Sequence, residues 1–184
     1  IVGGVAILLG LFERLKIAEM RSSRGALREG LLYEMLGRIR HTDPRDSTVR
    51  RFTERYGVDH KQATAIEKMS LDFLDQCPKS WMLSGQDYRH LLIWAARLHE
   101  IGLALSYRGY HKHSAYLILH GDTPGFSRQE KSMLGFLLRN HRRKFTQSGL
   151  ENVFHDEQAK LTKLCVLFRL AVLLNRGRRK RIIP

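Results

Sequence analysis

Hydrophobic residues in the first forty positions recur at the spacing of two helices. Between residues 4 and 16 the apolar positions fall three or four apart, and the same spacing returns between residues 26 and 36, where Gly37 is placed to end the helix. The short stretch 17–21 between them is predicted to be extended. The apolar positions of the two helices are Val5, Leu8, Leu9, Phe12 and Leu15, and then Ala26, Leu27, Leu31, Leu32, Met35 and Leu36.

Downstream of the first forty residues the helical period continues, and no segment alternates as a strand does. Pro44 follows a turn and is suited to the first position of a helix. Asp59, with Gln62 three residues later, is predicted to cap the next helix, and Ser127 with Glu130 has the signature of a capping box. The predicted helices start at Pro44 and at Asp59, span 87–101 and 110–120, follow Ser127, and span about 156–175.

Glycine and proline mark where these helices end. Pro78 breaks the helical pattern between residues 75 and 84. Gly102 ends the predicted helix 87–101, and Gly121 ends the predicted helix 110–120. The last helix is apolar nearly all round from Leu164 to Leu174, which predicts a place in the middle of a bundle. The pattern therefore predicts a mainly α fold.

Composition narrows the class of protein. The chain has 184 residues, with 43% hydrophobic and 27% charged residues and four prolines, as expected of an ordinary folded domain. Its longest apolar run, Val5 to Phe12, is much shorter than a membrane span requires. Two cysteines give neither a disulfide framework nor a zinc site, which favours the cytoplasm, with peripheral association at the inner membrane surface left open.

Charge is the most pronounced compositional feature. The chain carries 32 Lys and Arg against 18 Asp and Glu, a formal net charge of +14. Such a surface attracts polyanions, and the charge alone selects a class of partner rather than one molecule. The chain opens on Ile1 instead of a starting methionine, and we expect it to be a part of a longer protein.

Histidines gather in the second half of the chain. Three contexts combine them with other polar residues: His99-Glu100 at a helix end, residues 110–116 at the start of the next helix, and residues 140–143. In a helical bundle, a histidine next to a carboxylate, with further histidines on neighbouring helices, is a common way to hold a metal ion that hydrolyses phosphate esters. The pattern resembles the HD phosphohydrolase superfamily.

The HD pattern is incomplete at its ligand positions. The pair itself is His99-Glu100, the earlier ligand position falls near Met69, and the late one falls near Val172. Neither a thioether nor an isopropyl group binds magnesium or manganese, which prefer oxygen ligands. We therefore expect a degenerate site without a metal ion. His99 and His113 are then either packed, hydrogen-bonded bundle residues or phosphate contacts, and the sequence leaves both open.

Several longer motifs resemble the exopolyphosphatase/guanosine pentaphosphate phosphohydrolase (Ppx/GppA) family, and the resemblance covers essentially the whole chain. The front motifs are IVGGVAILLGLFERL from Ile1 and GALREGLLYEML from Gly25. The later ones are WAARLHEIG from Trp94, GYHKHSAYLI from Gly109, PGFSRQE from Pro124, HRRK from His141 and FRLAVLLNRGR from Phe168.

The resemblance implies two units. Residues 1–40 would be the end of an actin-like catalytic domain, and residues 41–184 an all-helical, HD-like domain. Gly3 and Gly4 match a Gly-rich turn of the family's nucleotide site, where small residues let backbone amides approach an anion. Arg28-Glu29 matches an Arg-Glu-Gly motif and is predicted to be structural. The family's phosphate loops and catalytic carboxylate precede this segment, so the chain alone is expected to be inactive.

The activity implied is hydrolysis of the terminal phosphoanhydride of polyphosphate or guanosine pentaphosphate, with Mg²⁺ in the full-length enzyme. The helical domain would bind the polyanion and form a homodimer, without recognising a specific nucleic acid. Arginine suits this task because its planar fork binds two phosphate oxygens. The candidate phosphate contacts are Gly3, Gly4, His111, Lys112, His113, Arg139, His141, Arg142, Arg143, Lys144, Arg169 and Arg176.

Two alternatives differ in their chemistry. One is a stand-alone, metal-dependent HD hydrolase that acts on nucleotides, which would bind a metal ion at His99-Glu100. The other is a nucleic-acid-binding module without enzymatic activity. The low aromatic content of 9%, without interleaving of aromatic and basic residues, speaks against a stacking surface for nucleic acid.

Overall fold

The computed structural model describes residues 2–16 and 43–178, and every regular element in these two stretches is a helix. The first stretch holds α1 (Val2–Leu15), whose side chains are mostly exposed. The predicted helix 26–36, the extended stretch 17–21 and the Arg28-Glu29 pair lie outside the described residues. Within the described part, no helix is both long and apolar enough to cross a membrane.

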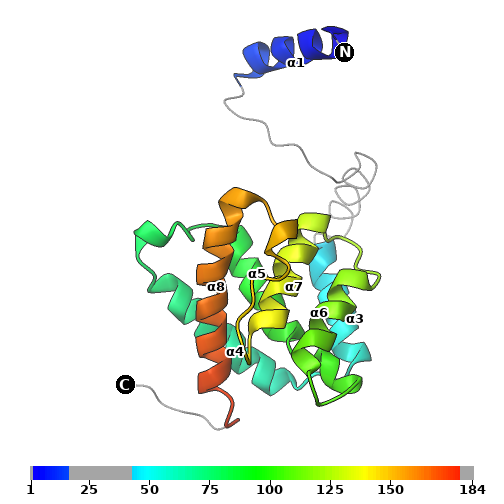
Figure 1. The fold of residues 1–184 in the computed structure, drawn as a ribbon, viewed down its shortest axis with the longest axis vertical. Helices are drawn as coiled ribbons and strands as arrows, with labels where there is room; N and C mark the ends of the chain where they lie inside the picture. The colour runs from blue at the N-terminus through cyan, green and yellow to red at the C-terminus, as the bar shows by residue number, and fades with distance from the viewer. Residues whose placement is uncertain (1, 17–42, 179–184) are drawn as a thin grey trace.

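Residues 43–178 form a helical bundle (Figure 1). Its elements, in chain order, are α3 (Pro44–Arg55), α4 (His60–Asp75), the short 3-10 helix η1 (Lys79–Trp81), α5 (Gln86–Leu98), the 3-10 helix η2 (Ile101–Ala104), α6 (Tyr110–His120), α7 (Arg128–Asn140), the 3-10 helix η3 (Leu150–Asn152) and α8 (His155–Leu174). The mainly α fold is confirmed.

Helices α3, α4 and α7 start at the signals predicted for them, which are Pro44, Asp59 and Ser127 with Glu130. Asp43 caps α3 ahead of Pro44, and the Asp59 carboxylate accepts hydrogen bonds from the backbone amides of residues 61 and 62 at the start of α4. Ser127 and Glu130 form the full reciprocal capping box of α7. Each cap satisfies backbone N–H groups that the first turn of a helix leaves unpaired.

Helix α5 is the centre of the bundle. It contacts α3, α4, α7 and α8, and its residues Leu92, Trp94 and Ala95 are almost completely buried. Around it, the core is completed by Ile66, Leu134, Phe136, Leu137, Leu138, Leu161, Leu164 and Phe168. Close packing of these side chains supplies the main stabilisation of the bundle.

The prediction for the last helix is wrong. Helix α8 packs against α4, α5 and α7 with one face, so it covers the central helix α5 instead of being surrounded (Figure 1). Val166, Leu170 and Leu173, one helical turn apart, are 42–61% exposed on its other face. An apolar circumference alone does not bury a helix, because burial depends on how many neighbours surround it.

Helix α5 also ends earlier than predicted, at Leu98 instead of residue 101. The chain then turns at His99 and Glu100 into η2. Gly102 lies so close to the start of α6 that a Cβ atom there would be 2.2 Å from the Tyr110 carbonyl oxygen. Ser114 joins the two elements, since its hydroxyl accepts from the Gly102 amide and donates to the His99 carbonyl, both at 2.9 Å.

Candidate functional site: an arginine-lined cleft

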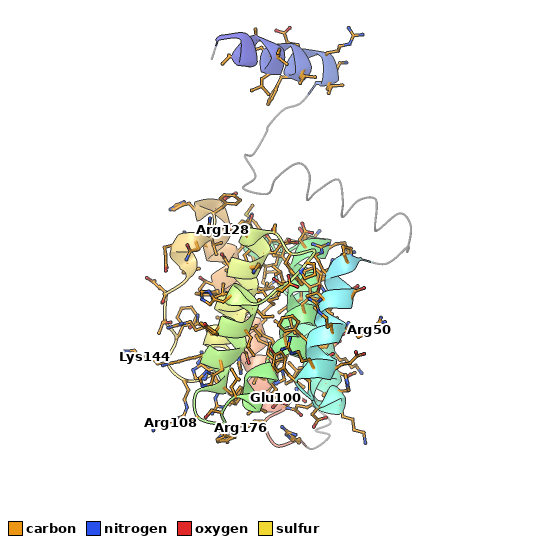
Figure 2. All side chains as sticks on the ribbon, turned by 90° about the vertical axis from the view of Figure 1, so that its right-hand side faces the viewer. Arg50, Glu100, Arg108, Arg128, Lys144 and Arg176 are labelled. Carbon is orange, nitrogen blue, oxygen red and sulfur yellow. The ribbon has the colours of Figure 1, made fainter. Side chains whose placement is uncertain are left out.

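A cleft with a volume of about 740 Å³ opens where α5 ends, α6 begins and α7 ends, and α8 forms its side. Figure 2 shows Glu100, Arg108 and Arg176 at this end of the bundle, with Arg128 at the opposite end. The cleft brings together the sequence contexts around residues 99, 110 and 141, as the HD-like pattern predicts. Its lining residues also include Gln62, Leu103, Tyr107, Val166, Leu170 and Leu173.

Packed rings form the floor of the cleft. The ring of His141 lies 5.5 Å from those of His99 and Tyr110, and 6.0 Å from that of Phe168, measured between centroids. His111 packs against His141 from α6, with centroids 6.1 Å apart. Both His99 and His141 are at most 2% exposed, so the floor is part of the domain's interior.

Backbone carbonyls set the tautomers of the two buried histidines. His99 Nδ1 lies 2.7 Å from the Ala96 oxygen, and His141 Nδ1 lies 2.7 Å from the Leu138 oxygen. A carbonyl only accepts, so both Nδ1 atoms carry a proton and donate it. In the neutral rings Nε2 then has a free lone pair, and His141 Nε2 has no hydrogen-bond partner among the described residues.

Burial keeps these rings uncharged. It lowers the pKa of His99 to about 4 and that of His141 well below its ordinary value. Burial, with nearby Arg142, also lowers the pKa of His111 to about 4. Near pH 7 these histidines offer hydrogen bonds and not positive charge. Their role as phosphate contacts stays a prediction, and the packed, hydrogen-bonded alternative describes the geometry of His99.

Among the residues that the structure describes, Glu100 contributes the one carboxylate that lines the cleft. Its Oε1 atom accepts a hydrogen bond from Arg178 at 3.1 Å and lies 3.8 Å from His99 Nε2. Arg178 also donates to Asp59 Oδ2 at 2.8 Å, so it joins the start of α4 to the end of α5. Burial raises the pKa of Glu100, and the adjacent Arg178 guanidinium opposes that rise.

Three further arginines line the cleft with neither a carboxylate nor a backbone carbonyl as a side-chain partner in the described part of the chain: Arg142, Arg143 and Arg176. The guanidinium of Arg142 lies over the Tyr110 ring, 4.5 Å from its centroid. This cation–π contact leaves the charge of Arg142 uncompensated. The cleft therefore has an excess of positive charge that an anionic ligand would neutralise.

Arg169 lines the same cleft, but its guanidinium is already in use. It donates to the carbonyl oxygen of Asn140 and, at 2.7 Å, to that of Arg143. Both carbonyls belong to the end of α7 and the turn after it. The structure thus places the predicted phosphate contact Arg169 beneath the turn that carries Arg142 and Arg143.

The other predicted phosphate contacts do not line the cleft. His111 is buried against His141, Lys112 and Lys144 are exposed, and His113 and Arg139 are half-buried on α6 and α7. Gly3 and Gly4 lie within the first turn of α1, so the structure has helix where a Gly-rich turn before the helix was expected. Glycine is common both in turns and near helix starts, so the two glycines alone do not distinguish a turn before the helix from its first turn. The anion-binding role of this pair stays a prediction.

The two non-ligand positions of the HD pattern are packed. Val172 lines the cleft and packs against the core. Met69 is half-buried, and its sulfur accepts a hydrogen bond from the Asn175 side chain at 3.2 Å. Gln62 donates to the Asn175 carbonyl at 3.0 Å, which ties α4 to the end of α8. The positions that would hold a metal ion in an HD enzyme are thus used for packing and side-chain hydrogen bonds.

The described residues around the cleft do not fit a divalent cation. No three His, Cys, Asp or Glu side chains within the described ranges are placed to hold a metal ion together. The nearby carboxylates of Glu100 and Asp59 are paired with Arg178, and the imidazoles are poor ligands for a hard cation such as Mg²⁺. We therefore derive no metal-dependent step at this cleft.

Comparison with known proteins decides the family. Residues 45–184, most of the chain, match the family described as Ppx/GppA phosphatase, domain III. The chain belongs to the Ppx/GppA phosphatase family. The resemblance found in the motifs is confirmed, and domain III of this family is the all-helical part described above.

Relatives match over nearly the whole chain. The "Guanosine-5'-triphosphate,3'-diphosphate pyrophosphatase" of Pseudoalteromonas translucida is 38% identical over 100% of this chain and 37% of its own length. The proteins of the same name from Photobacterium profundum and Aliivibrio fischeri are 37% and 35% identical, over 93% and 98% of this chain. The chain spans about a third of the length of these Ppx/GppA relatives.

Sequence reasoning missed an ion-pair network at this Ppx/GppA cleft. Arg178 is not among the predicted site residues, and Asp59 is predicted only to cap a helix. In the structure one arginine bridges Asp59 and Glu100 across 119 and 78 residues of sequence. No local signal predicts such a long-range pair, because it depends on how α4, α5 and the end of α8 meet.

Proposed function

We propose that this chain is the helical part of a hydrolase that cleaves terminal phosphoanhydride bonds of polyphosphate or guanosine pentaphosphate. In this proposal the cleft holds the polyanionic substrate, and cleavage is carried out by residues outside this chain. The names of the relatives support the reaction class and the guanosine substrate. In one cleft, Arg142, Arg143 and Arg176 have neither a carboxylate nor a backbone carbonyl partner among the described residues, and this observation carries the proposal.

The charge balance of the cleft explains why phosphate would bind. Arg142, Arg143, Arg169 and Arg176 contribute four positive charges without a carboxylate partner among the described residues. The fifth lining arginine, Arg178, is paired with Glu100 and Asp59. A phosphate chain that replaces the counterions of these arginines gains free energy from ion release, and that gain falls as salt rises. Guanidinium groups can each bind two phosphate oxygens, so the cleft fits a chain of phosphates better than a single carboxylate.

Further parts of the proposal concern the whole protein. We propose that residues 1–40 belong to the catalytic domain and residues 41–184 to the substrate-binding one. The reaction would use Mg²⁺ bound outside this cleft, because the carboxylates of Glu100 and Asp59 are paired with Arg178. We also propose a homodimer in the cytoplasm. The stripe Val166, Leu170 and Leu173 supports an interface, since these apolar side chains are 42–61% exposed on the side of α8 that borders the cleft.

Binding to polyphosphate tests the proposal. The protein should bind long-chain polyphosphate at low salt, with an association constant that falls steeply as salt rises, and should release no phosphate from it. The double variant Arg142→Gln/Arg143→Gln should flatten the slope of log K against log salt by about 1.4, at about 0.7 per lost contact as for single-stranded nucleic acid.

The matched control is Arg50→Gln/Arg128→Gln. It removes the same charge from exposed positions outside the cleft and should leave the slope nearly unchanged. Equal losses in both double variants would show that net charge and not the cleft determines binding. Phosphate release above a buffer control would contradict the assignment of cleavage to residues outside the chain.

A further inference from the structure

The segment after α7 carries three consecutive basic residues, Arg142, Arg143 and Lys144, of which the first two line the cleft. It is also conformationally unusual, since Arg143 has a φ of 63°, in the left-handed region. A side chain other than glycine in this region is disfavoured and persists only when its surroundings hold it there. Neighbouring groups must therefore hold Arg143 in this conformation.

The two ends of the segment are anchored locally. The Asn140 side-chain oxygen accepts from the Thr146 amide at 2.9 Å, which closes the loop between them. Phe145 packs edge-to-face on Phe136 of α7, with ring centroids 5.8 Å apart. These contacts fix where the turn begins and ends, but they do not touch the carbonyl of the strained residue Arg143.

Arg169 supplies the missing contact from α8. Its guanidinium donates to the Asn140 carbonyl, which is one of the unpaired carbonyls at the end of α7, and to the Arg143 carbonyl at 2.7 Å. Positive charge at this position also complements the negative end of the helix dipole. One planar fork thus connects the last residue of α7 to the strained residue of the turn.

We propose that Arg169 is a positioning residue, which holds the turn 141–144 so that Arg142 and Arg143 face the substrate cleft. The effect of Arg169 on substrate binding rests on the proposed function, whereas its effect on the conformation of the turn does not. It also reassigns a residue that the sequence marks as a phosphate contact. A lysine cannot replace it, because a single ammonium lacks the rigid fork that spans two carbonyls.

Limited trypsin digestion tests the structural part without any ligand. Trypsin cuts after arginine and lysine, so cleavage after residues 142–144 reports how often the turn opens. Arg169→Met and Arg169→Lys should both raise that cleavage rate about tenfold or more, as expected when a charge-assisted hydrogen bond is lost from the closed form. Cleavage as slow as in the wild-type protein would overturn the inference.

Controls separate local opening from unfolding. Arg176→Met, which removes a cleft arginine without hydrogen bonds to the turn, should leave the cleavage rate after 142–144 unchanged. Cleavage after Arg50, in the middle of α3, reports opening of the bundle away from the cleft and should stay constant. If Arg169→Met does not fold, Arg169→Lys, which keeps the charge and most of the stem, decides the result alone.

Polyphosphate binding tests the consequence. Arg176→Met should flatten the slope of log K against log salt by about 0.7, the value for one contact, whereas both Arg169 variants should flatten it by about twice as much. A wild-type level of binding in Arg169→Lys would make Arg169 a simple charge contact and overturn the inference. Absence of binding in the wild-type protein would overturn the proposed function instead, and the digestion would still decide the positioning role.

Discussion

At the scale of single residues, the cleft depends on imidazoles that stay neutral. His99 and His141 are buried, each donates through Nδ1 to a backbone carbonyl, and neither has space for the hydration that a charged ring needs. The charged side chain next to His99 is that of Glu100, and the guanidinium of Arg178 pairs with it. The cleft is therefore basic because of its arginines and not because of its histidines.

This arrangement predicts how stability depends on pH. The pKa of His99 is about 4 in the folded protein, and an unfolded histidine titrates near 6.5. Below pH 6.5 the unfolded chain binds a proton that the folded one does not, so stability falls with falling pH until about pH 4. His99 alone should cost about 2 kcal/mol of unfolding free energy between pH 7 and pH 5.

Urea unfolding at pH 7, 6 and 5 measures this dependence. The variant His141→Gln removes one of the buried titrating groups and should show a smaller loss of unfolding free energy over the same range than the wild-type protein. Its matched control is His60→Gln, an exposed histidine at the start of α4, which should leave the pH dependence unchanged. If the free energy of unfolding of the wild-type protein stays constant from pH 7 to pH 5, then His99 and His141 are not held in the neutral form.

At the scale of elements, helices and their caps follow from local sequence, but their neighbours do not. Ser127 and Glu130 determine the start of α7, and Asp43 with Pro44 determines that of α3, because a cap involves only adjacent residues. The place of α8 depends on which helices surround it, which its own apolar pattern does not contain. For this reason its existence was predictable and its burial was not.

Two substitutions on α8 check its one-sided packing. Leu173→Gln should change the free energy of unfolding by less than about 0.5 kcal/mol, because that side chain is 61% exposed. Phe168→Ala, on the buried face, should lower it by about 3–5 kcal/mol through the cavity it leaves. Chemical denaturation of both variants gives these values, and equal losses would mean that both faces are covered.

The same variant also tests the proposed dimer. If the stripe forms the dimer interface, Leu173→Gln should lower the molecular mass measured by analytical ultracentrifugation.

At the scale of the whole molecule, the sequence predicted which segments meet at the cleft and not the side-chain contacts that hold them there. The contexts around His99, Tyr110 and His141 meet at one cleft, because each follows a helix end or start that the pattern predicts. The roles of Arg169 and Arg178 were not predictable, since both reach partners on other elements. Family membership could be predicted because several motifs occur in the same order as in the family. Composition and periodicity carry no such information.

The central claim is that the arginine-lined cleft, and no other basic surface of this chain, binds the phosphate chain. Hydrogen–deuterium exchange with and without long-chain polyphosphate tests it most directly, since it locates protection along the sequence. We predict protection at residues 99–110, 141–146 and 169–178 at low salt, which disappears at high salt. Protection centred on α3 and α4, or spread evenly over all basic segments, would contradict the claim.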